Sequence, residues 1–176
     1  MRYHTILIDP PWLERGGGKI KRGADRHYPL LKTPDIVRVI RESGMFVPAD
    51  DCHLYLWVTN NFLRDGLWVM EQLGFRYVTM LTWAKDRIGL GQYFRGQTEP
   101  LLFGVKGRLP AQVRTQSTLI VAPRSKHSQK PAKSYEVIEA VSPAPRLEMF
   151  ARSRRDGWVS WGNEVAEDLF AVEVQP

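Results

Sequence analysis

The sequence predicts a single-domain α/β fold in which a mostly parallel sheet is covered by helices on both faces. Apolar runs of strand length alternate with amphipathic segments in a β-α-β rhythm. The 176 residues, 43% of them hydrophobic, suffice for one packed core and leave no room for a second domain. The expected strands cover residues 3–8, 52–59, 76–85, 99–105, 119–122 and 146–151.

Three helices are expected between these strands. The first is capped by Thr33, carries Pro34 in its first turn and ends near Gly44. The second begins at residue 60 or 61 and ends at residue 74, and the third covers residues 131–141. In the second helix the expected buried face consists of Leu63, Leu67, Met70 and Leu73. The glycine-containing segments 13–28 and 86–98 are expected to be flexible loops.

The first strand ends in the tetrapeptide Asp9-Pro10-Pro11-Trp12, which is the most informative stretch of the chain. Neither proline can donate a hydrogen bond to a neighbouring strand, so pairing stops there while the backbone carbonyls remain acceptors. A planar amine could donate to the Asp9 carboxylate and to the Pro10 carbonyl while Trp12 covers the face of its ring. A nucleobase amine fits this description. The alternative is a proline turn in which Asp9 only caps the loop.

The charge distribution indicates a polyanionic partner. The net charge is +6, but residues 1–155 hold 25 basic and 14 acidic residues, a net +11, and the remaining residues form an acidic tail. Positive residues gather in loop segments, among them Lys19, Lys21, Arg22 and Arg95. Nucleic acid is the leading candidate, and simple solubility is the alternative.

Other classes of protein are disfavoured. No apolar stretch reaches membrane-spanning length and the first residues lead directly into a strand, so we expect no membrane association and a cytoplasmic location. The single cysteine, Cys52, is expected in the core, as are Trp57 and Trp68. The four histidines show no metal-ligand spacing, and we expect no metal site.

Several motifs in order give the chain a recognisable pattern. It resembles the MT-A70-like adenine-N6 methyltransferases, relatives of the circularly permuted amino-methyltransferases in which the catalytic strand precedes the cofactor strand. The resemblance covers nearly the whole chain and implies a Rossmann-like methyltransferase fold with that permuted motif order. Its parts are Asp9-Pro10-Pro11-Trp12, Trp83-Ala84-Lys85, Glu99, Lys130-Pro131, Glu148-Met149-Phe150-Ala151-Arg152 and Trp158-Val159-Ser160-Trp161-Gly162-Asn163-Glu164.

The resemblance implies transfer of a methyl group from S-adenosylmethionine to the exocyclic amine of adenine, by direct displacement without a metal. Asp9, Pro10, Pro11 and Trp12 would form the catalytic corner. At the cofactor, Lys130 would lie near the methionine end, with Glu148 orienting it. The full set implied for the cofactor is Ile8, Asp9, Lys130, Glu148, Phe150, Arg152, Asn163 and Glu164.

On the substrate side the expected residues come from the corner and two basic loops. They are Trp12, Lys19, Lys21, Arg22, Trp83, Lys85, Tyr93, Arg95 and Glu99. For Trp83 a core position is nearly as well supported. DNA is favoured over RNA as substrate because the compact chain has no appended RNA-binding module. An inactive nucleic-acid-binding partner subunit is the non-enzymatic alternative, and the resemblance is compatible with a homodimer or a heterodimer.

Overall fold

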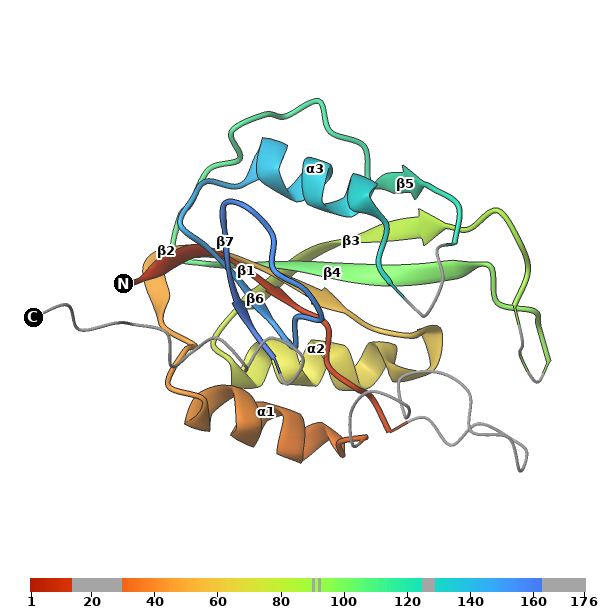
Figure 1. The fold of residues 1–176 in the computed structure, drawn as a ribbon, viewed down its shortest axis with the longest axis horizontal. Coiled ribbons are helices and arrows are strands. Elements are labelled where there is room, and N and C mark those ends of the chain that lie inside the picture. The colour runs from red at the N-terminus through yellow and green to blue at the C-terminus, as the bar shows by residue number, and fades with distance from the viewer. Residues whose placement is uncertain (14–29, 90, 92, 125–128, 163–176) are drawn as a thin grey trace, which may run out of the picture.

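The computed structural model describes residues 1–13, 30–89, 91, 93–124 and 129–162. Within them the chain forms one seven-stranded sheet with the strand order β5-β3-β4-β2-β1-β6-β7 (Figure 1). The strands are β1 Tyr3–Ile8, β2 Pro48–Trp57, β3 Arg76–Ala84, β4 Thr98–Lys106, β5 Leu119–Val121, β6 Arg146–Met149 and β7 Trp158–Trp161. The helices are α1 Thr33–Glu42, the short 3₁₀ helix η2 Asn60–Phe62, α2 Leu63–Gln72 and α3 Ala132–Val141.

The pairing of the strands confirms the predicted mostly parallel α/β fold. Neighbouring strands are parallel except where β4 lies between β2 and β3, so only β4 runs against the other strands of the described sheet. The six predicted strands are present to within a few residues. The seventh, β7, was not predicted, although it lies within one of the quoted motifs. Its four residues are too few to show a clear alternation of polar and apolar side chains.

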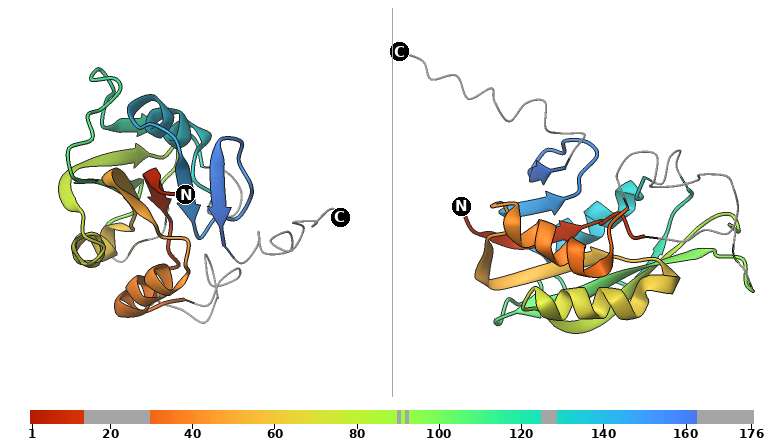
Figure 2. Two further views of the ribbon diagram at one scale, coloured as in Figure 1. Left: turned by 90° about the vertical axis from the view of Figure 1, so that its left-hand side faces the viewer. Right: turned by 90° about the horizontal axis from the view of Figure 1, so that it is seen from below.

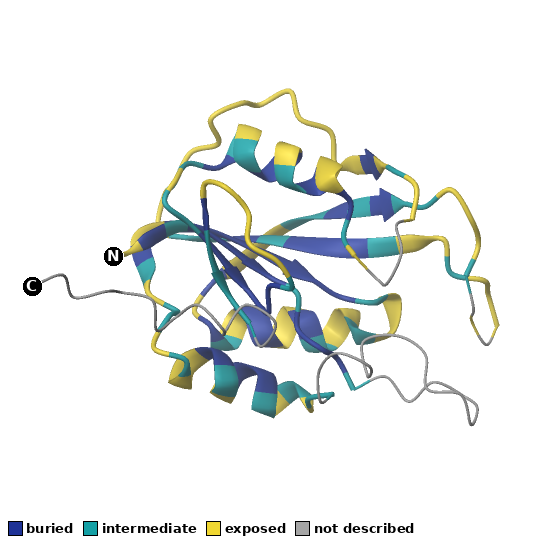
Figure 3. Ribbon diagram, viewed as in Figure 1, coloured by how far each residue is buried: buried dark blue, intermediate teal, exposed yellow. Residues whose placement is uncertain are grey.

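Helices cover both faces of the sheet. Figures 1 and 2 show α1 and α2 side by side on one face and α3 on the other. Consecutive side chains of β1 point to opposite faces, so Ile6 and Ile8 pack toward α1 and α2 while Leu7 packs toward α3. Burial on both faces explains why residues 6–8 of β1 and 54–57 of β2 are continuously apolar, and Figure 3 shows the central strands largely buried.

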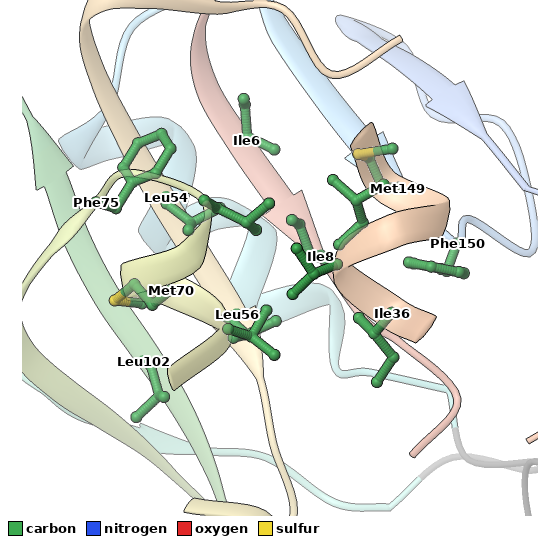
Figure 4. Packing of buried hydrophobic residues seen from close by; sticks show 14 of the residues in the cluster. Ile6, Ile8, Ile36, Leu54, Leu56, Met70, Phe75, Leu102, Met149 and Phe150 are labelled. Atoms are coloured by element: carbon green, nitrogen blue, oxygen red, sulfur yellow. The ribbon is translucent and has the colours of Figure 1, made fainter. Parts of the chain in front are cut away.

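The larger of the two core clusters lies between the sheet and the helices α1 and α2. Figure 4 shows Ile36 of α1 and Met70 of α2 pointing into it, together with Met149 and Phe150 at the end of β6. All four side chains are at most 6% exposed. Cys52 is fully buried in the same cluster, as its apolar context predicted.

The expected buried face of α2 is partly wrong. Met70 and Leu73 are buried, but Leu63, Leu67 and Trp68 are 38%, 37% and 39% exposed. The reason is Gly66, which faces the sheet: a Cβ atom built on it would lie 2.4 Å from Cγ1 of Val58. The helix therefore packs closely on its glycine side and turns its larger neighbours outward. The same finding corrects the expectation that Trp68 is a core residue.

Thr33 does not cap α1 as expected. Lys32 is the capping residue, and Thr33 is the first residue of the helix. Its Oγ1 donates instead to Oδ1 of Asp65 on α2 over 2.7 Å, so it links the two helices. Pro34 does lie in the first turn, where the absence of an N–H costs nothing.

The topology brings the predicted motifs to one edge of the sheet. Asp9 follows β1, Lys85 follows β3 and Phe150 follows β6, all at the carboxyl ends of strands. Because β4 is reversed, its beginning, with Glu99, reaches the same edge. In open α/β sheets ligands bind beyond this edge, so a functional site is expected here.

Candidate active site

The Asp9-Pro10-Pro11-Trp12 corner is fixed by its backbone. Asp9 N–H donates to the carbonyl of Met149 over 3.3 Å, which holds the corner against the end of β6. The carbonyl of Pro11 accepts from Leu31 N–H over 2.9 Å, and the carbonyl of Pro10 accepts from Trp12 N–H over 2.9 Å. A carbonyl has two lone pairs, so the Pro10 carbonyl can accept a second hydrogen bond.

Four charged side chains form a chain of ion pairs beside this corner. Nζ of Lys130 lies 2.8 Å from Oδ1 of Asp9 and 3.0 Å from Oε1 of Glu99. The other oxygen of Glu99 lies 2.8 Å from Nζ of Lys85. Exposed fractions of these side chains range from 11% for Lys130 to 20% for Asp9 and Lys85. Carboxylates and ammonium groups alternate, so each charge in this set of four side chains lies beside an opposite charge.

The protonation states follow from these neighbours. Burial by itself lowers the pKa of Lys130, but the carboxylates of Asp9 and Glu99 outweigh it and hold that pKa above its usual range. Burial likewise raises the pKa of Glu99, yet the ammonium groups of Lys130 and Lys85 bring it below its usual range. Both groups are therefore charged at neutral pH.

Two tryptophans lie beneath the ammonium groups. Nζ of Lys130 is 5.3 Å from the ring centre of Trp57, and Nζ of Lys85 is 4.7 Å from that of Trp83. Both distances allow a cation–π interaction. The two rings meet edge to face, with their centres 6.2 Å apart. Trp57 is fully buried, as predicted for a core residue. Its Nε1 is buried with no hydrogen-bond acceptor among the described residues.

Glu148 has a different partner from the one expected. Its Oε1 accepts a 2.7 Å hydrogen bond from the hydroxyl of Tyr135, whereas Lys130 is held by Asp9 and Glu99. Burial raises the pKa of Glu148, and the nearby charge of Asp9 adds to this effect. The sequence analysis assigned no role to Tyr135, which lies in the helix expected over residues 131–141. A tyrosine on a buried helix face needs a partner for its hydroxyl, and that requirement was the available signal.

Trp12 and Trp83 lie deeper than a substrate-facing role suggests. Trp12 is 5% exposed, donates through Nε1 to the Trp57 carbonyl over 3.0 Å and stacks on Phe62. Trp83 is 3% exposed and donates to the Ala122 carbonyl over 2.8 Å. The structure therefore places both rings in the core, because each indole N–H finds its partner there. For Trp83 this decides between the two positions considered.

The remaining predicted residues divide into three groups. Ile8 and Phe150 are buried at the sheet edge, 0% and 6% exposed, and Arg152, which follows Phe150 in the chain, is partly exposed. Tyr93 is 95% exposed, and Arg95 is exposed on the same loop. Lys19, Lys21, Arg22, Asn163 and Glu164 lie outside the described residues.

Comparison with known proteins identifies the family. The MT-A70 family model matches residues 3–164. The chain belongs to the MT-A70 family. Relatives include the type II methyltransferase M.MunI of a Mycoplasma species, which is 29% identical over 99% of this chain and 82% of its own length. The N6-methyladenosine RNA methyltransferase MTA1 of Pyricularia oryzae is 32% identical over 93% of the chain, and the N(6)-adenine-specific methyltransferase METTL4 of Mus musculus is 29% identical over 93%.

The relatives differ in length. The chain spans 47% of the fungal MTA1, 37% of METTL4 and about a quarter of the plant MT-A70-like proteins. MT-A70 family methyltransferases use S-adenosylmethionine as methyl donor.

The residues at the sheet edge fit S-adenosylmethionine chemically. This ligand carries a carboxylate, an ammonium and a sulfonium cation at one end, and a buried ammonium beside carboxylates offers opposite charges to all three. Trp57, whose ring lies below Nζ of Lys130, adds an unused hydrogen-bond donor, because no described residue supplies an acceptor for its Nε1. Among the described residues no group of three or more His, Cys, Asp or Glu side chains could hold a metal ion. None of the described helices is long and apolar enough to cross a membrane.

Proposed function

We propose that this MT-A70 protein transfers a methyl group from S-adenosylmethionine to the exocyclic N6 amine of adenine in DNA. The observation that carries the proposal is the Asp9 carboxylate, which is 20% exposed at the end of β1 and whose Oδ1 is bound by the nearly buried ammonium of Lys130. A carboxylate held in this way is oriented before the substrate arrives. Pre-orientation of charged groups is the main source of rate enhancement in many enzymes.

Asp9 has one oxygen available for the substrate. Oδ1 accepts from Lys130, and no described residue donates to Oδ2, which leaves Oδ2 to accept one N–H of the adenine amine. The second N–H is assigned to the Pro10 carbonyl. Two such hydrogen bonds localise the nitrogen lone pair, which is otherwise delocalised into the ring, and hold it in one direction. Asp9 Oδ2 is also the atom that takes up the proton lost by the amine.

The methyl donor is assigned to the carboxyl ends of β1 and β6. Lys130 and Glu148 would hold its charged end, and Arg152, Asn163 and Glu164 would bind its ribose and adenine, with Ile8 and Phe150 as apolar walls. When bound, S-adenosylmethionine supplies the methyl group as an electrophile. Glu99 keeps Lys130 in place, and Lys85 keeps Glu99 in place.

DNA is proposed over RNA for two reasons. The similarity to M.MunI, a bacterial DNA methyltransferase, extends over 99% of this chain and 82% of that protein. The chain also spans less than half of MTA1, which is named as an RNA methyltransferase. RNA is the second candidate, since adenine presents the same amine in both polymers.

The decisive experiment uses labelled S-adenosylmethionine with matched DNA and RNA oligonucleotides, each single-stranded and duplex. Label in DNA, recovered as N6-methyladenine after digestion, is the expected result. Label in RNA alone would replace DNA by RNA in the proposal. An inactive partner subunit would transfer no label, and calorimetry with S-adenosylmethionine separates this case from an unsuitable substrate, because such a subunit should not bind the methyl donor.

Two lesser proposals accompany the function. The cytoplasm is the proposed location, since nucleic acid and S-adenosylmethionine are both intracellular. A homodimer or heterodimer is also proposed, because a relative from Danio rerio is named as a subunit, METTL3. Sedimentation analysis of the purified chain distinguishes a homodimer from a monomer that needs another partner.

A further inference from the structure

A groove of about 600 Å³ opens beside the proposed active site, at the beginnings of α1 and α2. Its described walls combine apolar rings with cations, among them Phe62, Trp68, Lys32 and Arg64. We propose that this groove binds the nucleotide that follows or precedes the target adenine on the same strand. Its base would stack on Trp68, and its phosphate would contact Lys32 and Arg64. This inference rests on the proposed nucleic-acid substrate.

Trp68 is the first reason. It is 39% exposed, whereas Trp12, Trp57, Trp83 and Trp158 are at most 9% exposed. The close packing at Gly66 turns the ring of Trp68 away from the core, so the fold itself gives this ring no partner there. Aromatic side chains next to positive charges are the common platform for single-stranded nucleic acid, because every base has a face that can stack.

The charges are the second reason. Lys32 and Arg64 are exposed, and neither forms an ion pair with any described residue. The groove also contains Asp65, but its Oδ1 accepts from the Thr33 hydroxyl over 2.7 Å. Two cations against one engaged carboxylate leave the groove positive, which suits a phosphate and disfavours an acidic protein segment.

Continuity with the catalytic corner is the third reason. Phe62, one wall of the groove, stacks on Trp12 with ring centres 5.3 Å apart and planes inclined by 30°. Leu13, another wall, directly follows Trp12 in the chain. The groove therefore begins where the corner ends. An adenine held at Asp9 would have its neighbour within reach of these walls, since adjacent bases are joined by a single phosphodiester.

The test is a fluorescence titration of the full chain with single-stranded DNA oligonucleotides of random sequence. Stacking on Trp68 should quench part of the tryptophan emission, and Trp68→Phe should remove that part while keeping a ring to stack on. Trp68→Ala and Arg64→Ala should each weaken binding by roughly ten-fold, which matches the lower part of the range for one stacked base. Affinity for S-adenosylmethionine should not change.

Matched controls come from the rest of the described surface. Tyr77→Ala removes an aromatic ring that is 44% exposed on β3. Arg114→Ala removes an exposed cation from segment 107–118, which passes over the α3 face of the sheet (Figure 1). Neither control should change binding.

The outcomes separate this inference from the proposed function. If the unaltered protein binds and methylates DNA but the groove variants behave like the controls, the groove is not a nucleotide site and the function stands. If the variants instead reduce the sedimenting mass of the protein, the groove is a protein interface and the inference is wrong. If the unaltered protein binds no nucleic acid, both proposals fall together.

Discussion

Asp9 and Lys130 are 121 residues apart in the chain, and Nζ of Lys130 lies 2.8 Å from Oδ1 of Asp9. The contact joins the end of β1 to the beginning of α3 across the carboxyl edge of the sheet. It means that the carboxylate proposed to bind the amine and the ammonium proposed to bind the methyl donor are held by each other. The two proposed ligand sites therefore share one ion pair. A substitution of either residue should change the geometry of both sites, although not to the same extent.

Replacement of Asp9 by asparagine tests the catalytic assignment. The amide keeps the size of the side chain and an acceptor for Lys130, but it removes the charge that orients the amine and takes up its proton. We expect methyl transfer to fall about a hundred- to thousand-fold, the usual cost of one such group. Affinity for S-adenosylmethionine, measured by calorimetry, should change far less. Near-normal turnover would place the catalytic group elsewhere.

Lys130→Met should affect both the binding of the methyl donor and the titration of Glu99. Loss of a hydrogen bond from a charged group costs about 1.5 to 3 kcal/mol, so affinity for S-adenosylmethionine should fall by at least ten-fold. Because Lys130 helps to hold the pKa of Glu99 below its usual range, that pKa should rise in the variant. The titration of the Glu99 carboxyl, followed by NMR, should then move to higher pH.

The matched control for this variant is Lys133→Met, which removes an exposed lysine paired with Glu136 one turn further along α3. Its donor affinity and the titration of its Glu99 should equal those of the unaltered protein. Equal behaviour of both lysine variants would show that Lys130 has no part in donor binding.

Glu99→Gln tests how the charge of Glu99 makes the unfolding free energy depend on pH. The pKa of Glu99 is lower in the folded protein than its ordinary value of 4.5, so its charge stabilises the fold above that value and this contribution disappears as the pH falls through the folded pKa. We expect the variant to lose about 1 to 3 kcal/mol of unfolding free energy at neutral pH. The difference should shrink in urea titrations performed below pH 4.5. Glu136→Gln, at an exposed pair, should show neither effect.

Gly66→Ala tests the close packing of α2. A Cβ atom at this position would lie 2.4 Å from Cγ1 of Val58 and 3.0 Å from Cδ1 of Leu102. Overpacking of this kind costs about 1 to 3 kcal/mol. Alanine gains at most about 1 kcal/mol over glycine in a helix, so the net effect is destabilising. Urea unfolding measures it, with the exposed Leu67→Ala as the control. A more stable Gly66→Ala would mean that α2 sits further from the sheet.

The sequence was sufficient to predict most of the sheet because its strands are short apolar runs between clear turn signals. It also brought Asp9, Lys130 and Glu148 into one proposed site through their motifs. It could not predict which carboxylate Lys130 contacts, since that depends on the reversed β4 bringing Glu99 to the carboxyl edge. The reversal of β4 is a property of the folded sheet, and the residue pattern of β4 itself does not indicate it.

The outward position of Trp68 could not be predicted from the sequence for a related reason. The helical periodicity is read from the spacing of large apolar side chains. This spacing predicted that Leu63 and Leu67 belong to the buried face of α2. The face that is buried contains Gly66, Val69 and Met70, and the glycine lets the helix approach the sheet closely because it has no side chain. A small residue that permits close approach gives no hydrophobic signal, so only the packed structure reveals which side of the helix meets the sheet.

The dependence of DNA binding on salt tests the role of the basic loops. Arg87 and Arg95 are exposed on the loop between β3 and β4, and phosphate contacts made by such residues release condensed counterions. Binding should therefore weaken steeply as salt is added. Each lost phosphate contact lowers the log–log slope by roughly 0.7 to 0.9, so the double variant Arg87→Ala/Arg95→Ala should flatten it by about 1.4 to 1.8. Substituting Arg108 and Arg114, on segment 107–118, should leave the slope unchanged. Affinity independent of salt in the unaltered protein would exclude a nucleic-acid substrate and point to a small adenine-containing acceptor, which the corner at Asp9 could hold equally well.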